Sequence, residues 1–128
     1  MLNLIIKKEK IYFIMGKSDA LNLLNIFDSQ NGVFVLEGGG VEEMTFSLSD
    51  DEYVKFEKNR INFSLTEEGF DYGKHLLNFF LNNGYFFPAE FYEFERSGEG
   101  EKDRLIKTFF FSDDPNSIQA LKNDMNKR

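Results

Sequence analysis

The sequence predicts an α+β fold in which about three helices pack on a single mainly antiparallel sheet, within one domain spanning residues 1–128. Several short segments alternate apolar and polar residues, as half-buried strands do. Three other segments carry apolar residues at helical spacing. The chain also holds 16 Phe and 5 Tyr, which predicts an interior dense in aromatic rings. We find neither a linker nor an internal repeat along the sequence.

The first 32 residues are expected to form a hairpin and a helix. Residues 2–6 and 11–15 are the two strands, and the polar residues 7–10 form the turn between them. Ser18 is a suitable N-cap for the helix, and Asn31-Gly32 is a suitable end. The expected apolar stripe of this helix consists of Leu21, Leu23, Leu24, Ile26 and Phe27.

The next segments are expected to add strands to the sheet. Residues 33–36 and 44–48 read as two strands joined by a turn at Gly38-Gly39-Gly40. Residues 61–65 alternate strictly between apolar and polar side chains, which is typical of a half-buried strand. Residues 49–60 are compatible with either a helix or a strand, and both assignments remain open.

The strongest helical pattern covers residues 67–83. Thr66 is the expected N-cap, Glu67 and Glu68 suit the positive end of the helix dipole, and Gly84 is the expected stop. One face collects the apolar positions Phe70, Gly73, Leu76, Leu77, Phe80 and Leu81.

The remaining chain is expected to form two strands and a short helix. The strands cover residues 90–96 and 105–111 and are joined by a charged turn at residues 97–101. The second strand has almost no polar face, which predicts a central place in the sheet. Asp113-Asp114-Pro115 is a helix start, and the apolar stripe that follows is Ile118, Leu121 and Met125.

The residue types available for chemistry are few. With no Cys and a single His, the chain lacks the donors of most metal sites and most nucleophile–base pairs. His75 lies four residues after Asp71, so the pair is either a surface contact on the helix or the dyad of a small hydrolase. The sequence favours the surface contact, and it predicts no enzymatic activity, no cofactor and no metal.

The charge of the chain is negative and unevenly placed. The net charge is −7, and residues 42–71 carry nine acids against three bases, whereas residues 89–114 carry eight against four. Such a surface repels nucleic acid and anionic lipid and favours a cationic protein partner. The expected partner-binding residues are Glu42, Glu43, Asp50, Asp51, Glu52, Glu67, Glu68, Asp71, Glu93 and Glu95.

The densest aromatic stretch has two interpretations. Its rings are expected mainly in the core, but an exposed ring there would be an anchor for a partner, since interface hot spots favour aromatic side chains. The stretch consists of Phe79, Phe80, Phe86, Phe87, Phe91 and Phe94.

The chain resembles the small immunity proteins of bacterial polymorphic-toxin and contact-dependent growth inhibition systems. The resemblance rests on its short, acidic, cysteine-free, Phe-rich character and on two acidic loops, residues 37–43 and 97–101. It implies a cytoplasmic antitoxin that binds and blocks one cognate toxin domain, often a basic nuclease. Two alternatives stay open: a phage-type nucleic-acid mimic that inhibits a host nuclease, and the small hydrolase using His75 and Asp71.

Overall fold

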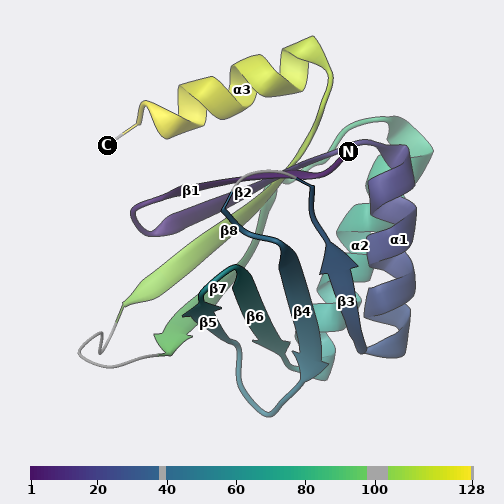
Figure 1. Cartoon of the computed structure of the whole chain (residues 1–128). Helices are drawn as coiled ribbons and strands as arrows, with labels where there is room; N and C mark the ends of the chain where they lie inside the picture. The colour runs from purple at the N-terminus through teal and green to yellow at the C-terminus, as the bar shows by residue number, and fades with distance from the viewer. Residues whose placement is uncertain (38–39, 98–103, 128) are drawn as a thin grey trace.

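A computed structural model describes residues 1–37, 40–97 and 104–127, and these residues form eight strands and three helices (Figure 1). Most of the glycine turn expected at residues 38–40 and of the charged turn expected at residues 97–101 lies outside the described residues. In chain order the elements are β1 (Asn3–Lys7), β2 (Lys10–Met15), α1 (Lys17–Ser29), β3 (Asn31–Val35), β4 (Glu43–Leu48), β5 (Tyr53–Glu57), β6 (Arg60–Leu65), α2 (Glu67–Asn83), β7 (Glu90–Ser97), β8 (Leu105–Ser112) and α3 (Pro115–Met125).

The eight strands of the described chain form one mixed sheet with the order β1-β2-β8-β7-β5-β6-β4-β3. Antiparallel pairs (β1–β2, β8–β7, β5–β6, β4–β3) alternate with parallel pairs (β2–β8, β7–β5, β6–β4). The predicted α+β class with a single sheet is confirmed, but "mainly antiparallel" is only partly right. Hairpins join neighbours in the sequence, whereas each parallel pair joins distant segments that local patterns do not connect.

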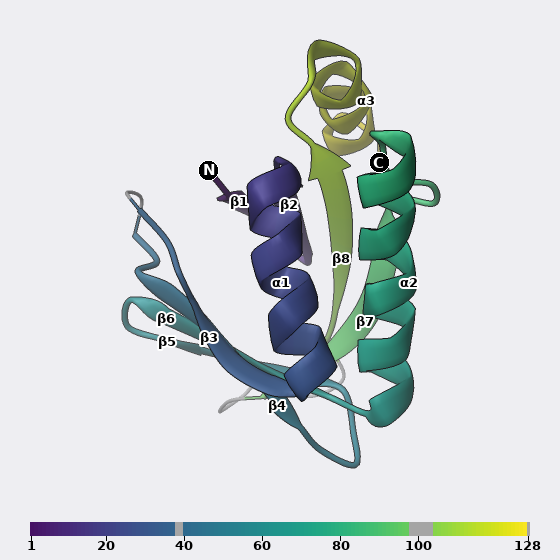
Figure 2. The same cartoon turned by 90° about the vertical axis from the view of Figure 1, so that its right-hand side faces the viewer.

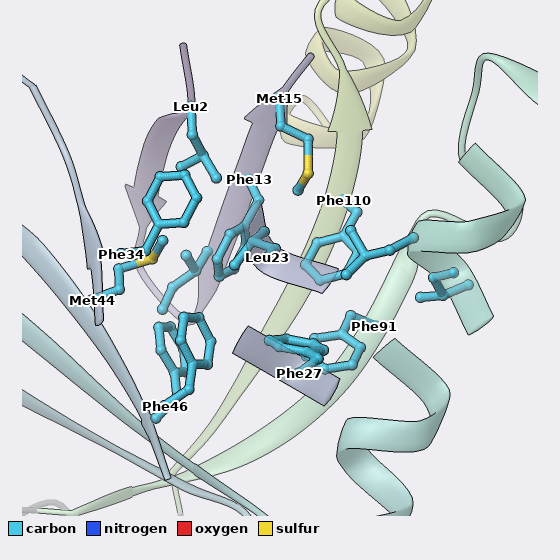
Figure 3. Packing of buried hydrophobic residues seen from close by; sticks show 14 of the residues in the cluster. Leu2, Phe13, Met15, Leu23, Phe27, Phe34, Met44, Phe46, Phe91 and Phe110 are labelled. Atoms are coloured by element: carbon cyan, nitrogen blue, oxygen red, sulfur yellow. The ribbon is translucent and has the colours of Figure 1, made fainter. Parts of the chain in front are cut away.

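The helices cover the sheet unequally. α1 and α2 lie side by side against one face, whereas α3 packs on the opposite face over β2 and β8 (Figure 2). The main core between the sheet and α1 and α2 is rich in phenylalanine (Figure 3). A smaller cluster under α3 contains Tyr12, Phe109, Phe111 and Leu121. The outward face of β3, β4, β6 and β5 therefore has no helix over it among the described residues.

The topology contains an internal repeat that the sequence did not reveal. β1-β2-α1-β3-β4 and β5-β6-α2-β7-β8 follow the same order of elements. In the sheet, the first hairpin of each half pairs in parallel with the second hairpin of the other half, through β2–β8 and β6–β4. The second half therefore forms the continuous centre of the sheet, β8-β7-β5-β6, whereas the two hairpins of the first half lie at its opposite edges.

The registers match residue by residue in the first hairpins and the parallel ladders, whereas β7 has a register shift between Glu90 and Glu93 that β3 lacks. Lys7 lies opposite Lys10 at the first turn, as Glu57 lies opposite Arg60 at the other. All six rungs of β2–β8 and of β6–β4 then correspond, so that the pair Tyr12–Phe109 is equivalent to the pair formed by Asn62 and Thr45. The two helices follow in phase: α1 buries residues 19, 20, 23 and 27, and α2 buries residues 69, 70, 73 and 77 among others.

Local sequence explains most element boundaries. Thr66 caps α2 by accepting a hydrogen bond from the Gly69 amide at 3.2 Å, and Gly84 ends it in the left-handed conformation, as predicted. α1 begins two residues earlier than expected, because its N-cap is Gly16 rather than Ser18. The Asp19 carboxylate closes that helix start by accepting from the Gly16 amide at 3.1 Å.

Three further expectations are tested by the arrangement of the sheet and the core. The ambiguous residues 49–60 form a loop and a strand, β5, which lies inside the sheet between β6 and β7. β8 lies between β2 and β7, so its predicted interior position is confirmed. Leu21, expected in the apolar stripe of α1, is instead 52% exposed.

Candidate binding face

Two of the predicted acidic groups meet at the N-terminal end of α2. The loop from Ser49 to Glu52 lies against the start of the helix, because the Ser49 amide donates to the Leu65 carbonyl at 2.8 Å and the Thr66 amide donates to a Glu52 carboxylate oxygen at 3.2 Å. A shallow hollow of about 560 Å³ there is lined by Leu48, Ser49, Asp50, Thr66 and Glu67. The loop and the helix therefore present their carboxylates on one surface.

The acids at this place have different roles. Glu52 is half-buried, and its carboxylate receives both the amide and the hydroxyl of Thr66, so it fixes the loop to the helix cap. Asp50, Asp51, Glu67 and Glu68 are exposed. We call these four residues the acidic end. Glu67 and Glu68 lie in the first turn of α2, where the positive end of the helix dipole stabilises them.

The main chain of β7 runs beside the anchored loop. Glu95 lies opposite Tyr53 in the parallel pair β7–β5, and its amide donates to the Glu52 carbonyl at 3.1 Å. Both side chains are exposed. Glu93 points to the same side but lies opposite Lys107 of β8, so its charge faces a cation. Because the buried Phe94 between them faces the main core, the side chains of Glu93 and Glu95 lie on the sheet face opposite α2, apart from the acidic end.

Tyrosines border the acidic end and were not predicted as site residues. Tyr72 and Tyr92 lie with their ring centroids 5.9 Å apart, and both are partly exposed. Burial raises the pKa of Tyr92, and the nearby carboxylates of Glu52 and Glu68 raise it further. In the sequence, Tyr72 stands next to Asp71 at the edge of the polar helix face, and this is the signal that could have indicated it.

Asp71 does not form the expected surface contact with His75. Its carboxylate instead pairs with Lys74 at 3.4 Å, and Lys74 also reaches Asp28 of α1 at 3.5 Å. His75 is exposed and lies near Tyr72, with ring centroids 6.4 Å apart. Asp71 and Asp28 thus share one ammonium group.

The third predicted acidic group lies elsewhere. Glu43 begins β4, at the opposite end of that strand from Ser49, and binds Arg60 at 2.5 Å. Glu42 is exposed beside it, and its amide donates to the Asn59 carbonyl at 2.7 Å. The structure therefore does not bring Glu42 and Glu43 together with the acidic end.

The aromatic stretch divides between the two interpretations. Phe80, Phe86, Phe91 and Phe94 are buried, as the core interpretation predicts. Phe87 is 71% exposed in the connection after α2. The half-buried ring of Phe79 meets the exposed Tyr85 edge-on, with centroids 5.5 Å apart. These exposed rings lie at the far end of α2 from the acidic end.

Further findings bear on what kind of site this is. Within residues 1–37, 40–97 and 104–127, no group of three or more His, Asp or Glu side chains is arranged to hold a metal ion. Among the helices of these residues, none has the length and apolar character needed to cross a membrane. Comparison of the chain with protein-family models, curated proteins and solved structures found no match.

Proposed function

We propose that this protein is a small binding protein without enzymatic activity, and that it engages a cationic protein surface through the acidic end. The observation that carries this proposal is the meeting of the exposed carboxylates of Asp50, Asp51, Glu67 and Glu68 at one end of α2. The adjacent ammonium of Lys74 is already shared between two other carboxylates. The acidic end therefore keeps a strong negative potential.

The physical setting suits recognition by charge. Exposed carboxylates on a rigid helix start and an anchored loop accelerate encounter with a basic surface, and the effect weakens as salt screens it. The pair Tyr72–Tyr92 adds aromatic area next to these charges. A basic side chain of the partner would find both a carboxylate and a ring there.

Within this class we favour an immunity protein that acts in the cytoplasm and blocks a basic toxin domain, in many such systems a nuclease. The proposal follows the family resemblance and agrees with the acidic end. A nucleic-acid mimic is the second candidate, but its carboxylates would need to follow one face at phosphate spacing, whereas Glu42 and Glu43 are remote from the acidic end. The small hydrolase loses its basis, because Asp71 pairs with Lys74.

The test begins with partner capture by crosslinking in the organism that makes the protein. The isolated partner should be basic at neutral pH, and equimolar wild-type protein should abolish its activity. Asp50→Lys and Glu67→Lys should weaken this inhibition severalfold, whereas Glu42→Lys, an equal charge change at a remote exposed site, should not. Equal effects of all three substitutions would contradict the acidic end as the binding surface.

A further inference from the structure

The internal repeat allows each place in the first half of the chain to be compared with its equivalent in the second. Because α1 and α2 run in phase, Asn22 occupies on α1 the place that Tyr72 occupies on α2. The ladders relate the strands in the same way. Thr45 of β4 and Phe109 of β8 are equivalent positions. Val33 lies opposite Thr45, and Glu90 lies opposite Phe109, so Val33 and Glu90 are equivalent as well. Asn22 with Val33 therefore corresponds to Tyr72 with Glu90.

In the second half, this place between helix and strand is filled. The Tyr72 hydroxyl donates to the main-chain carbonyl of Glu90 at 3.5 Å. Its ring lies beside those of Phe91 and Tyr92, with centroids 6.3 Å and 5.9 Å away. An aromatic ring thus bridges α2 and the edge of β7, and its hydroxyl lies at a strand carbonyl.

In the first half, the equivalent place is open. α1 and β3 lie side by side (Figure 1). Asn22 carries a short side chain, and a groove of about 610 Å³ lies between the helix and the strand. Asn22, Asn25 and Ile26 line the helix side, and Val33, Phe34 and Glu37 line the strand side. Val33 alternates with the buried Phe34, so its exposed side chain lies on the opposite face of β3 and its main chain borders the groove.

The main chain of Val33 points into the open edge of the sheet. In β4, the amides of Glu43 and Ser49 donate toward β6, to Asn59 at 3.3 Å and to Leu65 at 2.8 Å. Main-chain groups of successive strand residues point to opposite sides, so those of Met44, the residue after Glu43, point toward β3. Met44 lies opposite Phe34 and therefore forms its hydrogen bonds with that residue. The N–H and C=O groups of Val33 consequently face away from β4, at the edge strand of the sheet.

We propose that the groove between α1 and β3 receives an aromatic side chain, a tyrosine, carried by the partner protein; this inference rests on the proposed function for the existence of that partner. The ring packs on Ile26 and Phe34, and its hydroxyl donates to the Val33 carbonyl, as Tyr72 does to Glu90 in the other half. The exposed Glu37 at the rim has the charge that a basic partner surface requires.

The inference is tested on the full chain with N-acetyl-tyrosinamide as the probe, followed by amide chemical shifts in an NMR titration. Binding should shift Asn22, Gly32 and Val33. N-acetyl-phenylalaninamide, which lacks only the hydroxyl, should bind about two- to tenfold more weakly, the worth of one hydrogen bond. Asn22→Tyr should fill the groove from within and abolish binding, whereas the matched variant Asn22→Ala should keep it.

Several results would overturn the inference. These are equal binding of the two probes, unchanged probe binding to Asn22→Tyr, or shifts confined to other parts of the chain. If Asn22→Tyr does not fold, Asn25→Trp blocks the same groove one turn along α1 and is judged by the same criterion. Self-association of the wild type that Asn22→Tyr abolishes would assign the groove to Tyr85 or Phe87 of a second copy, against the proposal.

The outcome is separable from that of the proposed function. Both probes are uncharged, so Asp50→Lys should leave their binding unchanged. If the probe does not bind but partner binding still depends on the acidic charges, only the groove proposal is refuted. If the probe binds but partner binding does not depend on the acidic charges, only the proposed role of the acidic end is refuted.

Discussion

Gly73 of α2 is the position where a single added methyl group should disturb the core most. A Cβ atom built there would lie 2.2 Å from Cε2 and 2.5 Å from Cδ2 of Phe27, and 3.1 Å from Cε1 of Phe91. Unstrained carbon contacts are about 3.5–4.0 Å. Phe27 has little room to move, because its ring is packed edge-on against Phe46 and Phe70, with centroids 5.2 Å and 5.3 Å away.

Two opposing effects set the magnitude for Gly73→Ala. Alanine stabilises a helix interior by roughly 0.5–1 kcal/mol over glycine. Overpacking a core costs about 1–3 kcal/mol, and an overlap this severe belongs at the upper end of that range. We therefore expect a net loss of about 2 kcal/mol in the free energy of unfolding, which should lower the urea midpoint without changing the slope.

Asn78→Ala on the exposed face of the same helix is the matched control, and it should be neutral or slightly stabilising. Phe27→Leu should relieve the overlap, so the double variant should be less destabilised than the sum of the two single variants. A Gly73→Ala protein with a raised urea midpoint would refute the close packing of α1 on α2.

Three other substitutions test separate parts of the account. Phe80→Ala should lower the free energy of unfolding by about 3–5 kcal/mol in denaturant melts, because the side chain is buried and its ring stacks 4.4 Å from that of Phe86; no loss would refute the helical register. His75→Ala should leave stability and partner inhibition unchanged, since the side chain is exposed; loss of activity in a folded, partner-binding variant would contradict the absence of catalysis. Hydrogen bonds from Ser112 and Ser117 lower the pKa of Asp114, which caps α3, from its ordinary 3.8. The carboxylate therefore stabilises the fold above that value and loses its effect as the pH falls through the lowered pKa, so Asp114→Asn should flatten the acid limb of the stability curve; an unchanged limb in melts at a series of pH values would refute the cap.

Local periodicity predicts individual elements of this chain well. α2 spans the predicted residues 67–83 because its cap, its apolar stripe and its terminal glycine all agree. α1 illustrates the limit, since Gly16 caps it only with help from the Asp19 carboxylate, and a glycine N-cap is a weaker signal than the serine two residues later.

Local sequence patterns could not predict which strands pair with each other. The parallel pair β2–β8 joins residues about a hundred positions apart, and its existence depends on packing against α1, α2 and α3 rather than on either strand alone. The repeat was hidden for a related reason. Equivalent positions in the core share burial more than identity: Leu23 and Gly73 are both buried although their side chains differ.

The candidate site was predicted in part, because nearness in sequence does not imply nearness in space. Asp50 and Glu67 meet, although 17 positions separate them, because β5 and β6 form a hairpin that returns the chain to the same end of the sheet. Glu43 lies only seven positions before Asp50, but the extended strand β4 carries it about 17 Å away. The groove beside β3 had no sequence signal, since it arises from a short side chain at Asn22 facing an edge strand.

The central claim is that the acidic end recognises a cationic partner. Its most direct test is the association rate of the purified partner, measured by stopped flow at low and at physiological salt. Asp51→Lys should slow association about three- to tenfold at low salt and reduce its salt dependence, while Glu42→Lys, at an exposed site remote from the acidic end, should leave both close to wild type. Identical rates and salt dependence for wild type and Asp51→Lys would contradict the account.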